Sequence, residues 1–178
     1  MTYPVSIGLG ANLGDRELNL RIACQRLAEI DEFSLIRVSK VYQTPPFGPP
    51  DQPDYLNAAV LIETETPPQA LLEKIKAIEI AMGRVSRRRW GERVIDLDIL
   101  LYADRSIDNP GLVIPHAGID QRPFVVEPLI DLHGDRYVVP GMGDLATLRA
   151  RLRDSEISVF PCAALWESSS NPMRSTSD

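Results

Sequence analysis

The run Val94-Ile95-Asp96-Leu97-Asp98-Ile99-Leu100-Leu101-Tyr102 decides the fold. It is apolar, begins with β-branched residues and contains no Gly or Pro, which is typical of a strand inside a sheet. Because side chains alternate along a strand, we expect Asp96 and Asp98 on one face and the apolar residues, Leu101 included, on the other. Two residues of rise separate the carboxylates by roughly 6–7 Å. Both can therefore reach hard cations such as Mg²⁺, which binds oxygen ligands.

Basic residues precede this strand and give its two carboxylates a chemical context. They are Arg84, Arg87, Arg88, Arg89 and Arg93, with Trp90 among them. Two like charges on an apolar strand are costly unless cations neutralise them. An acidic strand beside a basic loop suggests a metal-bound polyphosphate. The alternative is an exposed strand whose aspartates are simply solvated.

Composition limits the class of protein. The chain has 178 residues, 44% hydrophobic and 25% charged, which fits one globular domain. We predict that this domain spans residues 1–160 and that 161–178 form a partly disordered tail. The net charge of −6 argues against binding to nucleic acid or to an anionic membrane. Without a long apolar run, a leader or paired Cys spacing, we expect a cytoplasmic protein with reduced Cys24 and Cys162.

The order of predicted elements indicates an α+β fold. The expected elements are a strand at 5–10, a helix at 16–29, strands at 34–43 and 55–64, a helix from Thr66 to Gly83, and the strand at 94–102. Asn12 and Asp15 are candidate caps of the first helix, and Thr66 is the expected cap of the second. The order β-α-β-β-α-β predicts a ferredoxin-like antiparallel sheet with both helices on one face. Asp96 and Asp98 would open onto the other face.

The sequence also predicts a loop, two further elements after the sheet and the position of one acidic residue. The proline-rich residues 44–54 form a stiff loop. Extra C-terminal elements follow the sheet: a strand or short helix at 125–132, and a helix at 145–153 capped by Asp144. Helical periodicity places Glu79 beside the buried stripe of the second helix, which favours a solvated flank position.

Several long motifs occur in one order along the chain. They are Thr44-Pro45-Pro46-Phe47-Gly48-Pro49, Gln52-Pro53-Asp54-Tyr55-Leu56-Asn57-Ala58, Arg89-Trp90-Gly91-Glu92-Arg93, Asp96-Leu97-Asp98-Ile99-Leu100, and Pro115-His116 with Arg122-Pro123-Phe124. Together they resemble the 6-hydroxymethyl-7,8-dihydropterin pyrophosphokinase family over about residues 4–140. This resemblance implies transfer of a diphosphate from ATP to a pterin alcohol in folate biosynthesis.

The resemblance also implies roles for individual residues. Asp96 and Asp98 would hold two Mg²⁺ ions, and the catalytic set would be Arg84, Arg93, Asp96 and Asp98. Pterin contacts would come from Thr44, Pro46, Phe47, Tyr55, Asn57, Asp96 and Phe124, with the ring stacked between Tyr55 and Phe124. ATP contacts would come from Glu79, Arg84, Trp90, Arg93, Ile99, His116 and Arg122.

Three functional hypotheses remain open from the sequence. The leading one is an active, monomeric pyrophosphokinase whose partners are two small molecules, ATP and the pterin. The second is a relative that keeps the pterin pocket but no longer transfers the diphosphate; the intact Asp96 and Asp98 pair argues against it. The third is a ferredoxin-like module that binds nucleic acid, which the acidic charge and the lack of an RNP motif disfavour.

Overall fold

The structure is a computed structural model that describes residues 1–46, 51–84, 92–153 and 155–167. Its elements, in chain order, are β1 (Tyr3–Ala11), α1 (Arg16–Ala28), β2 (Phe33–Val38), β3 (Tyr42–Thr44), β4 (Tyr55–Thr64), α2 (Pro68–Ala81), β5 (Asp96–Tyr102), β6 (Ile107–Asn109), β7 (Leu112–Ile114), the 3₁₀ turn η1 (Ile119–Gln121), α3 (Pro123–His133), β8 (Val138–Val139), β9 (Gly143–Asp144), α4 (Leu145–Arg151) and β10 (Ser158–Val159). In the described part of the chain, no helix is both long and apolar enough to cross a membrane.

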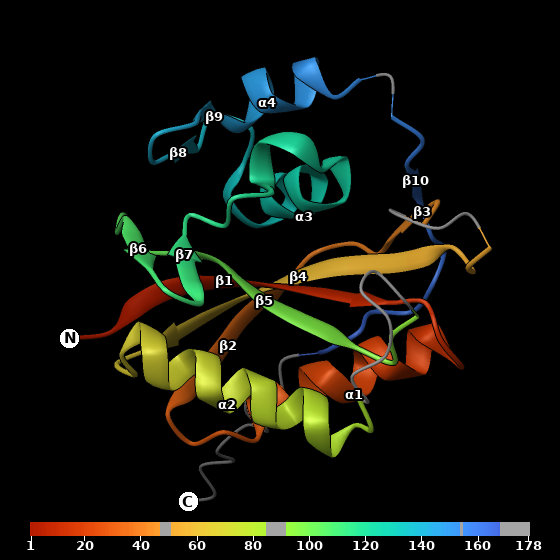
Figure 1. Cartoon of the computed structure of the whole chain (residues 1–178), viewed down its shortest axis with the longest axis horizontal. Coiled ribbons are helices and arrows are strands. Elements are labelled where there is room, and N and C mark those ends of the chain that lie inside the picture. The colour runs from red at the N-terminus through yellow and green to blue at the C-terminus, as the bar shows by residue number, and fades with distance from the viewer. Residues whose placement is uncertain (47–50, 85–91, 154, 168–178) are drawn as a thin grey trace, which may run out of the picture.

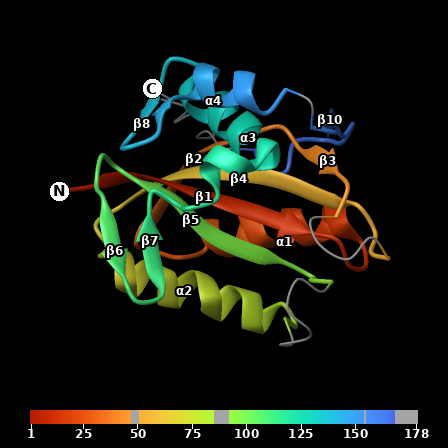
Figure 2. The same ribbon diagram turned by 45° about the horizontal axis from the view of Figure 1, so that its top comes forward.

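One antiparallel sheet forms the middle layer of the molecule. Its order is β10-β3-β4-β1-β5, and β2 also pairs with β4. Helices α1 and α2 cover one face, and α3 followed by α4 lies on the other (Figures 1 and 2). A mixed α/β fold with an antiparallel sheet is therefore confirmed. The face that the sequence left free for a ligand is partly covered by α3.

Two apolar cores hold these layers together. The first lies between the sheet and α1 and α2, and it includes Leu27 and Ile75, both with no exposed surface. Asp15 caps α1, as predicted, by accepting from the Leu18 backbone N–H at 3.0 Å. The second core joins the sheet to α3 and α4. The sheet is thus packed on both faces, which fixes the direction in which each strand residue points.

The predicted alternation along β5 fails at one point. Where β5 pairs with β1, the register shifts between Ser6 and Ile7, and Leu100 is the extra residue on β5. Such a bulge places two successive residues on the same face. Leu100 and Leu101 accordingly both join the second core, so the prediction that Leu101 faces the α1 and α2 side is wrong. Asp96 and Asp98 lie before the bulge and keep the predicted alternation.

The strand predicted at 34–43 is two strands, β2 and β3. Between them, the Ser39 backbone N–H donates to the Ala59 carbonyl at 2.9 Å, and the Ser39 hydroxyl accepts from the Ala59 N–H at 2.8 Å. A side chain thus replaces one backbone partner of β4 and lets the chain bend. The predicted cap of α2 is also wrong: the cap position is Pro67, and Thr66 instead bonds to the Thr64 hydroxyl.

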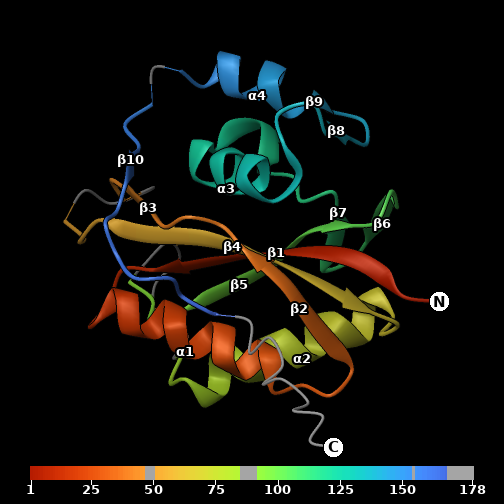
Figure 3. The same cartoon turned by 180° about the vertical axis from the view of Figure 1, so that it is seen from behind.

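The C-terminal part returns to the sheet after α4. Strand β10 pairs with β3, and the chain then runs toward α1 (Figure 3). Arg21 of α1 donates to the Ala164 carbonyl at 2.6 Å, and Leu165 is buried in the first core. The segment at 125–132 is helical, within α3, and Asp144 caps α4 as predicted. Most of the tail predicted to be disordered, residues 168–178, lies outside the described residues.

Candidate active site

One cavity gathers most of the predicted site residues. It has a volume of about 110 Å³ and lies between the sheet and the start of α3. It is lined by Gly8, Leu9, Gly10, Thr44, Pro45, Tyr55, Asn57, Arg93, Asp96, Asp98, Leu100, His116, Arg122, Phe124 and Val125. Residues predicted for the pterin, for ATP and for the metal therefore face one space, although they come from four separate parts of the chain.

Two glycines of β1 form the floor of this cavity. A Cβ atom on Gly10 would lie 3.2 Å from the Asn57 side-chain oxygen, and one on Gly8 would lie 3.3 Å from the Leu100 side chain. Both distances are tighter than ordinary contacts, so a side chain at either position would intrude on the cavity wall. From the sequence, Gly8 and Gly10 are only the final residues of the strand expected at 5–10. Their spacing of two, which puts both on one face, was the available signal.

The paired strands β3 and β4 contribute Thr44, Tyr55 and Asn57 to the cavity wall. Tyr55 and Asn57 are two residues apart on β4 and share a face, and Thr44 of β3 pairs with Tyr55. The Asn57 amide donates to the Thr44 hydroxyl at 3.0 Å. That bond fixes the orientation of the amide group. Burial raises the pKa of Tyr55, which favours its protonated, neutral phenol.

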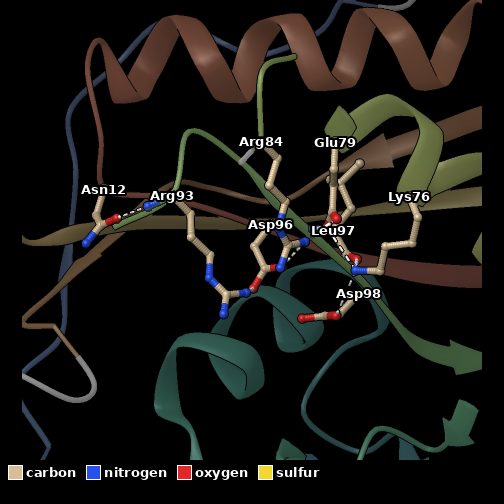
Figure 4. A network of polar contacts seen from close by, with 8 residues as sticks. All are labelled: Asn12, Lys76, Glu79, Arg84, Arg93, Asp96, Leu97 and Asp98. Atoms are coloured by element: carbon tan, nitrogen blue, oxygen red, sulfur yellow. Dashed lines mark hydrogen bonds and ion pairs between the residues drawn. The ribbon is translucent and has the colours of Figure 1, made fainter. Parts of the chain in front are cut away.

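The two carboxylates of β5 are held by cationic side chains (Figure 4). Asp96 accepts from Arg84 at 2.9 Å through one oxygen and from Arg93 at 2.9 Å through the other. Asp98 lies 3.6 Å from the Lys76 ammonium. Both aspartates therefore have cationic partners, although 39% of the Asp98 side chain is exposed, and the alternative of aspartates that are simply solvated is wrong. Lys76 was not identified from the sequence, because it belongs to α2 and meets Asp98 only through the fold.

Glu79 of α2 is buried behind β5, with only 3% of its side chain exposed. It accepts from the Leu97 backbone N–H at 2.6 Å and from Lys76 at 2.9 Å, and it forms an ion pair with Arg84. Burial raises the pKa of this carboxyl, whereas the hydrogen bonds and charge of Lys76 oppose the rise. The solvated flank expected from periodicity is therefore wrong.

The contacts of Glu79 and Lys76 provide hydrogen-bond partners for backbone groups at the edge of the sheet. Among the described strands, β5 is the last of the sheet path, so one side of its backbone has no strand beside it there. Glu79 accepts from the Leu97 N–H there, and Lys76 donates to the Leu97 carbonyl at 2.7 Å. Helix α2 thus substitutes for a missing strand at the residue between the two aspartates. This arrangement fixes the position from which Asp96 and Asp98 project.

Asn12 links the two loops that border the cavity. Its side-chain oxygen accepts from the Arg93 N–H at 2.8 Å, and its amide donates to Gln52 at 3.2 Å and to the Pro53 carbonyl at 3.3 Å. Asn12 is 1% exposed, so these partners replace water completely. As a candidate helix cap it was interpreted wrongly, because Asp15 alone caps α1. Its contacts hold the end of the proline-rich loop next to the end of the arginine-rich loop.

His116 faces the cavity in a defined protonation state. Its Nδ1 atom accepts from the Gly118 backbone N–H at 3.0 Å. Burial lowers the pKa of His116, and the positive charge of Arg122 also lowers it, while the charge of Asp98 opposes the change. At neutral pH the ring is therefore neutral with its proton on Nε2. That N–H is a donor suited to an anionic oxygen.

Some predicted residues do not line the cavity. Ile99 is buried in the first core on the opposite face of β5, so its side chain cannot contact a ligand there. Glu79 does not line the cavity and contacts the site through Arg84, Lys76 and the β5 backbone. Pro46 is described but is not among the lining residues. Phe47 and Trp90 lie outside the described residues.

The donor set suits a metal that arrives with a ligand. Within the described residues no group of three or more His, Cys, Asp or Glu side chains could hold a metal ion. Among the described lining residues, the carboxylate oxygens come from Asp96 and Asp98. Mg²⁺ is commonly held by one or two carboxylates together with phosphate oxygens and water. The residues present therefore fit Mg²⁺ only if phosphates complete its coordination.

Comparison with known proteins agrees with this chemistry. The family model for 7,8-dihydro-6-hydroxymethylpterin-pyrophosphokinase (HPPK) matches residues 6–134. The chain is 40% identical over 151 residues to the 2-amino-4-hydroxy-6-hydroxymethyldihydropteridine pyrophosphokinase of Haemophilus influenzae, covering 85% of this chain and 94% of that protein. A protein of the same name from Methylorubrum extorquens is 44% identical over 132 residues, covering 74% of this chain and 84% of that protein.

A solved structure shares the fold. The crystal structure of wild-type Plasmodium falciparum HPPK-DHPS with STZ-DHP matches 85% of this chain with a TM-score of 0.67 at 16% identity. The present chain spans 43% of that longer chain. At this identity the match concerns the arrangement of the elements.

Proposed function

The chain belongs to the 7,8-dihydro-6-hydroxymethylpterin-pyrophosphokinase family, and we propose that it transfers the terminal diphosphate of ATP to the hydroxymethyl group of 6-hydroxymethyl-7,8-dihydropterin. The products would be AMP and the pterin diphosphate, a reaction of folate biosynthesis. One observation carries the proposal. A single cavity combines aromatic and amide groups suited to a pterin with carboxylates and cationic groups suited to a metal-bound polyphosphate.

The pterin half of the proposal rests on three cavity residues. Tyr55 and Phe124 both line the cavity, and two aromatic side chains can stack on a flat heterocycle from opposite sides. The Asn57 amide, held in place by Thr44, offers a carbonyl oxygen to a donor on the ring. Thr44 and Pro46 would add contacts at the edge of the same ring. Phe47, predicted for the same role, stays a prediction because it is outside the described residues.

The phosphate half rests on groups that lie beside Asp96 and Asp98. Arg93, Arg122 and the Nε2–H of His116 can donate to phosphate oxygens from one side of the cavity. Asp96 and Asp98 would hold two Mg²⁺ ions. When bound, these ions would neutralise phosphate charge and make the pterin hydroxyl more acidic. Arg84 and Arg93, which bind Asp96 in the structure, would then be free to bind phosphate.

The transfer itself needs orientation more than covalent chemistry. The pterin hydroxymethyl oxygen would form a bond to the β-phosphorus of ATP while the bond from that phosphorus to the oxygen of AMP breaks in line. The hydroxyl proton is released, and AMP leaves with the bridging oxygen. Residues of this chain contribute by holding the pterin alcohol and the triphosphate close together and by matching the charge that develops between them.

The proposal also includes a finer fold class, a cellular location and an oligomeric state. We interpret β1-α1-β2-β4-α2-β5 as a ferredoxin-like unit, and the antiparallel order β5-β1-β4-β2 supports it. We also expect a cytoplasmic monomer. A pterin-binding relative without transferase activity would require a defect in the acidic or basic groups. The close packing of Asp96, Arg84 and Arg93 favours the active enzyme instead.

The test is AMP formation from ATP, with hydroxymethyl-dihydropterin and Mg²⁺ each left out in turn. We expect AMP only when both are present. Asp96→Asn and Asp98→Asn keep the shape of the side chains, and each should lower kcat at least about a hundredfold, as does loss of one preorganised electrostatic contact elsewhere. Asp108→Ala, an exposed site on β6, is the matched control. Normal turnover in both asparagine variants would refute the metal assignment.

A further inference from the structure

We propose that Lys76 is a positioning residue: it holds a fixed positive charge beside Asp98 and weakens binding of a free divalent cation, so that the cation enters with the nucleotide. The inference rests on the proposed function, which makes Asp98 a metal ligand. It concerns a residue of α2 that the sequence did not indicate.

The Lys76 ammonium is anchored independently of Asp98. It donates to the Leu97 carbonyl at 2.7 Å and to Glu79 at 2.9 Å, whereas its distance to Asp98 is 3.6 Å. The two short contacts are to the backbone of β5 and to a buried carboxylate, both rigid partners (Figure 4). The charge therefore stays at this place whether or not Asp98 is occupied.

The Lys76 ammonium is close enough to Asp98 to weaken binding of a cation there. A cation on the Asp98 oxygen would lie at about 2.1 Å from it, as Mg²⁺ does in proteins, and so within about 6 Å of the ammonium. At that separation, even with the dielectric constant of water, the repulsion between a divalent ion and an ammonium lowers the binding constant of the cation about tenfold. Salt and partial exposure reduce this, since 36% of the Lys76 side chain and 39% of the Asp98 side chain are exposed.

Among the described residues, the side chains that form ion pairs around β5 carry equal numbers of positive and negative charges. Three carboxylates, those of Glu79, Asp96 and Asp98, lie within ion-pair distance of three cationic side chains, those of Lys76, Arg84 and Arg93. A neutral cluster attracts a free cation weakly. ATP brings phosphate charge that the same cationic groups attract, and its oxygens complete the metal coordination. The cation and the nucleotide should therefore bind with positive coupling, whereas Lys76 should weaken binding of the cation alone.

A purely structural role for Lys76 makes a different prediction. If Lys76 only satisfies the edge of β5, its loss would lower stability or misplace Asp98, and cation binding would weaken. If its charge opposes the free cation, loss of that charge would tighten cation binding. The two explanations thus differ in the sign of one measured constant.

The probe is Mn²⁺, titrated into the nucleotide-free full chain at low ionic strength and followed by the electron paramagnetic resonance signal of free Mn²⁺. Lys76→Gln should tighten binding about three- to tenfold, the range that repulsion at this distance allows after screening. Lys76→Arg keeps the charge and should stay within about twofold of wild type. Lys74→Gln is the matched control, because Lys74 lies on the same helix but pairs with Glu32.

The second arm measures coupling. A nonhydrolysable ATP analogue should strengthen Mn²⁺ binding in wild type and in Lys76→Gln alike, because phosphate oxygens complete the metal coordination in both. Unchanged or weaker Mn²⁺ binding in Lys76→Gln, the same tightening in Lys74→Gln, or no strengthening of Mn²⁺ binding by the analogue would overturn the inference. Asp98→Asn separates the two proposals. If it leaves Mn²⁺ binding unchanged in the wild-type and Lys76→Gln backgrounds, the metal assignment itself fails.

Discussion

Replacing Glu79 by Ala tests whether α2 holds the acidic strand in place. The substitution removes the acceptor of the Leu97 N–H and the buried partner of Lys76 and Arg84. A buried N–H left without a partner costs about 1–3 kcal/mol. Breaking a fully buried ion pair costs about 3–5 kcal/mol.

The full ion-pair cost does not apply at this site. The Arg84 side chain is 25% exposed and keeps Asp96, and the Lys76 side chain is 36% exposed. Water and the remaining partners therefore compensate part of the loss. We expect Glu79→Ala to lower the free energy of unfolding by about 2–4 kcal/mol. Glu79→Gln keeps an acceptor for Leu97 and should cost roughly half as much.

Urea unfolding followed by circular dichroism measures these differences. Glu73→Ala is the control: it is the same substitution at an exposed position of α2, and we expect a change within about 0.5 kcal/mol. From most to least stable, the variants should rank Glu73→Ala, Glu79→Gln and Glu79→Ala. The reasoning would be refuted if Glu79→Ala were as stable as wild type, or if Glu79→Gln were as damaging as Glu79→Ala.

Three further predictions concern Gly10 in the cavity floor, His133 and the two thiols. Gly10→Ala should weaken pterin binding about fivefold, because the new Cβ displaces the Asn57 amide; pterin fluorescence titration measures it, and unchanged affinity would contradict it. Burial lowers the pKa of His133, so between its folded pKa and about pH 6.5 the unfolded chain binds more protons, and acid destabilises the fold. The difference in Tm between pH 7.5 and 5.5 should therefore be smaller in His133→Gln than in wild type; an equal difference would count against this. Burial raises the pKa of Cys24 to about 12, so at pH 8 a thiol reagent should label Cys162 and spare Cys24 until the protein unfolds.

Local patterns in the sequence predicted the features that depend on neighbouring residues. Alternation along a strand placed Asp96 and Asp98 on the cavity face, because two-residue periodicity follows from the backbone alone. The cap at Asp15 was predicted correctly for a similar reason: its partner, Leu18, is three residues away. Residues known to us only through the family motif, such as Phe124, also lie at the cavity, because the motif records a three-dimensional site.

Features that depend on distant contacts were missed. Lys76 has an unremarkable place in a helical pattern, and only the packing of α2 against the edge of β5 brings it to Asp98. Helical periodicity alone favoured a solvated position for Glu79, because it cannot show that a carboxylate has a buried backbone partner, whereas the family resemblance placed Glu79 at the ATP site. The bulge at Leu100 depends on the register with β1, which the sequence of β5 alone does not contain. Each of these three features depends on contacts between elements, which local patterns in the sequence do not record.

The central claim is that one cavity brings a pterin alcohol to the β-phosphorus of ATP. The most direct measurement is ³¹P NMR of the products formed from ATP, Mg²⁺ and hydroxymethyl-dihydropterin. We expect AMP and a pterin diphosphate in equal amounts, and no reaction without the pterin. Formation of ADP with a pterin monophosphate, or of AMP without the pterin, would contradict the account.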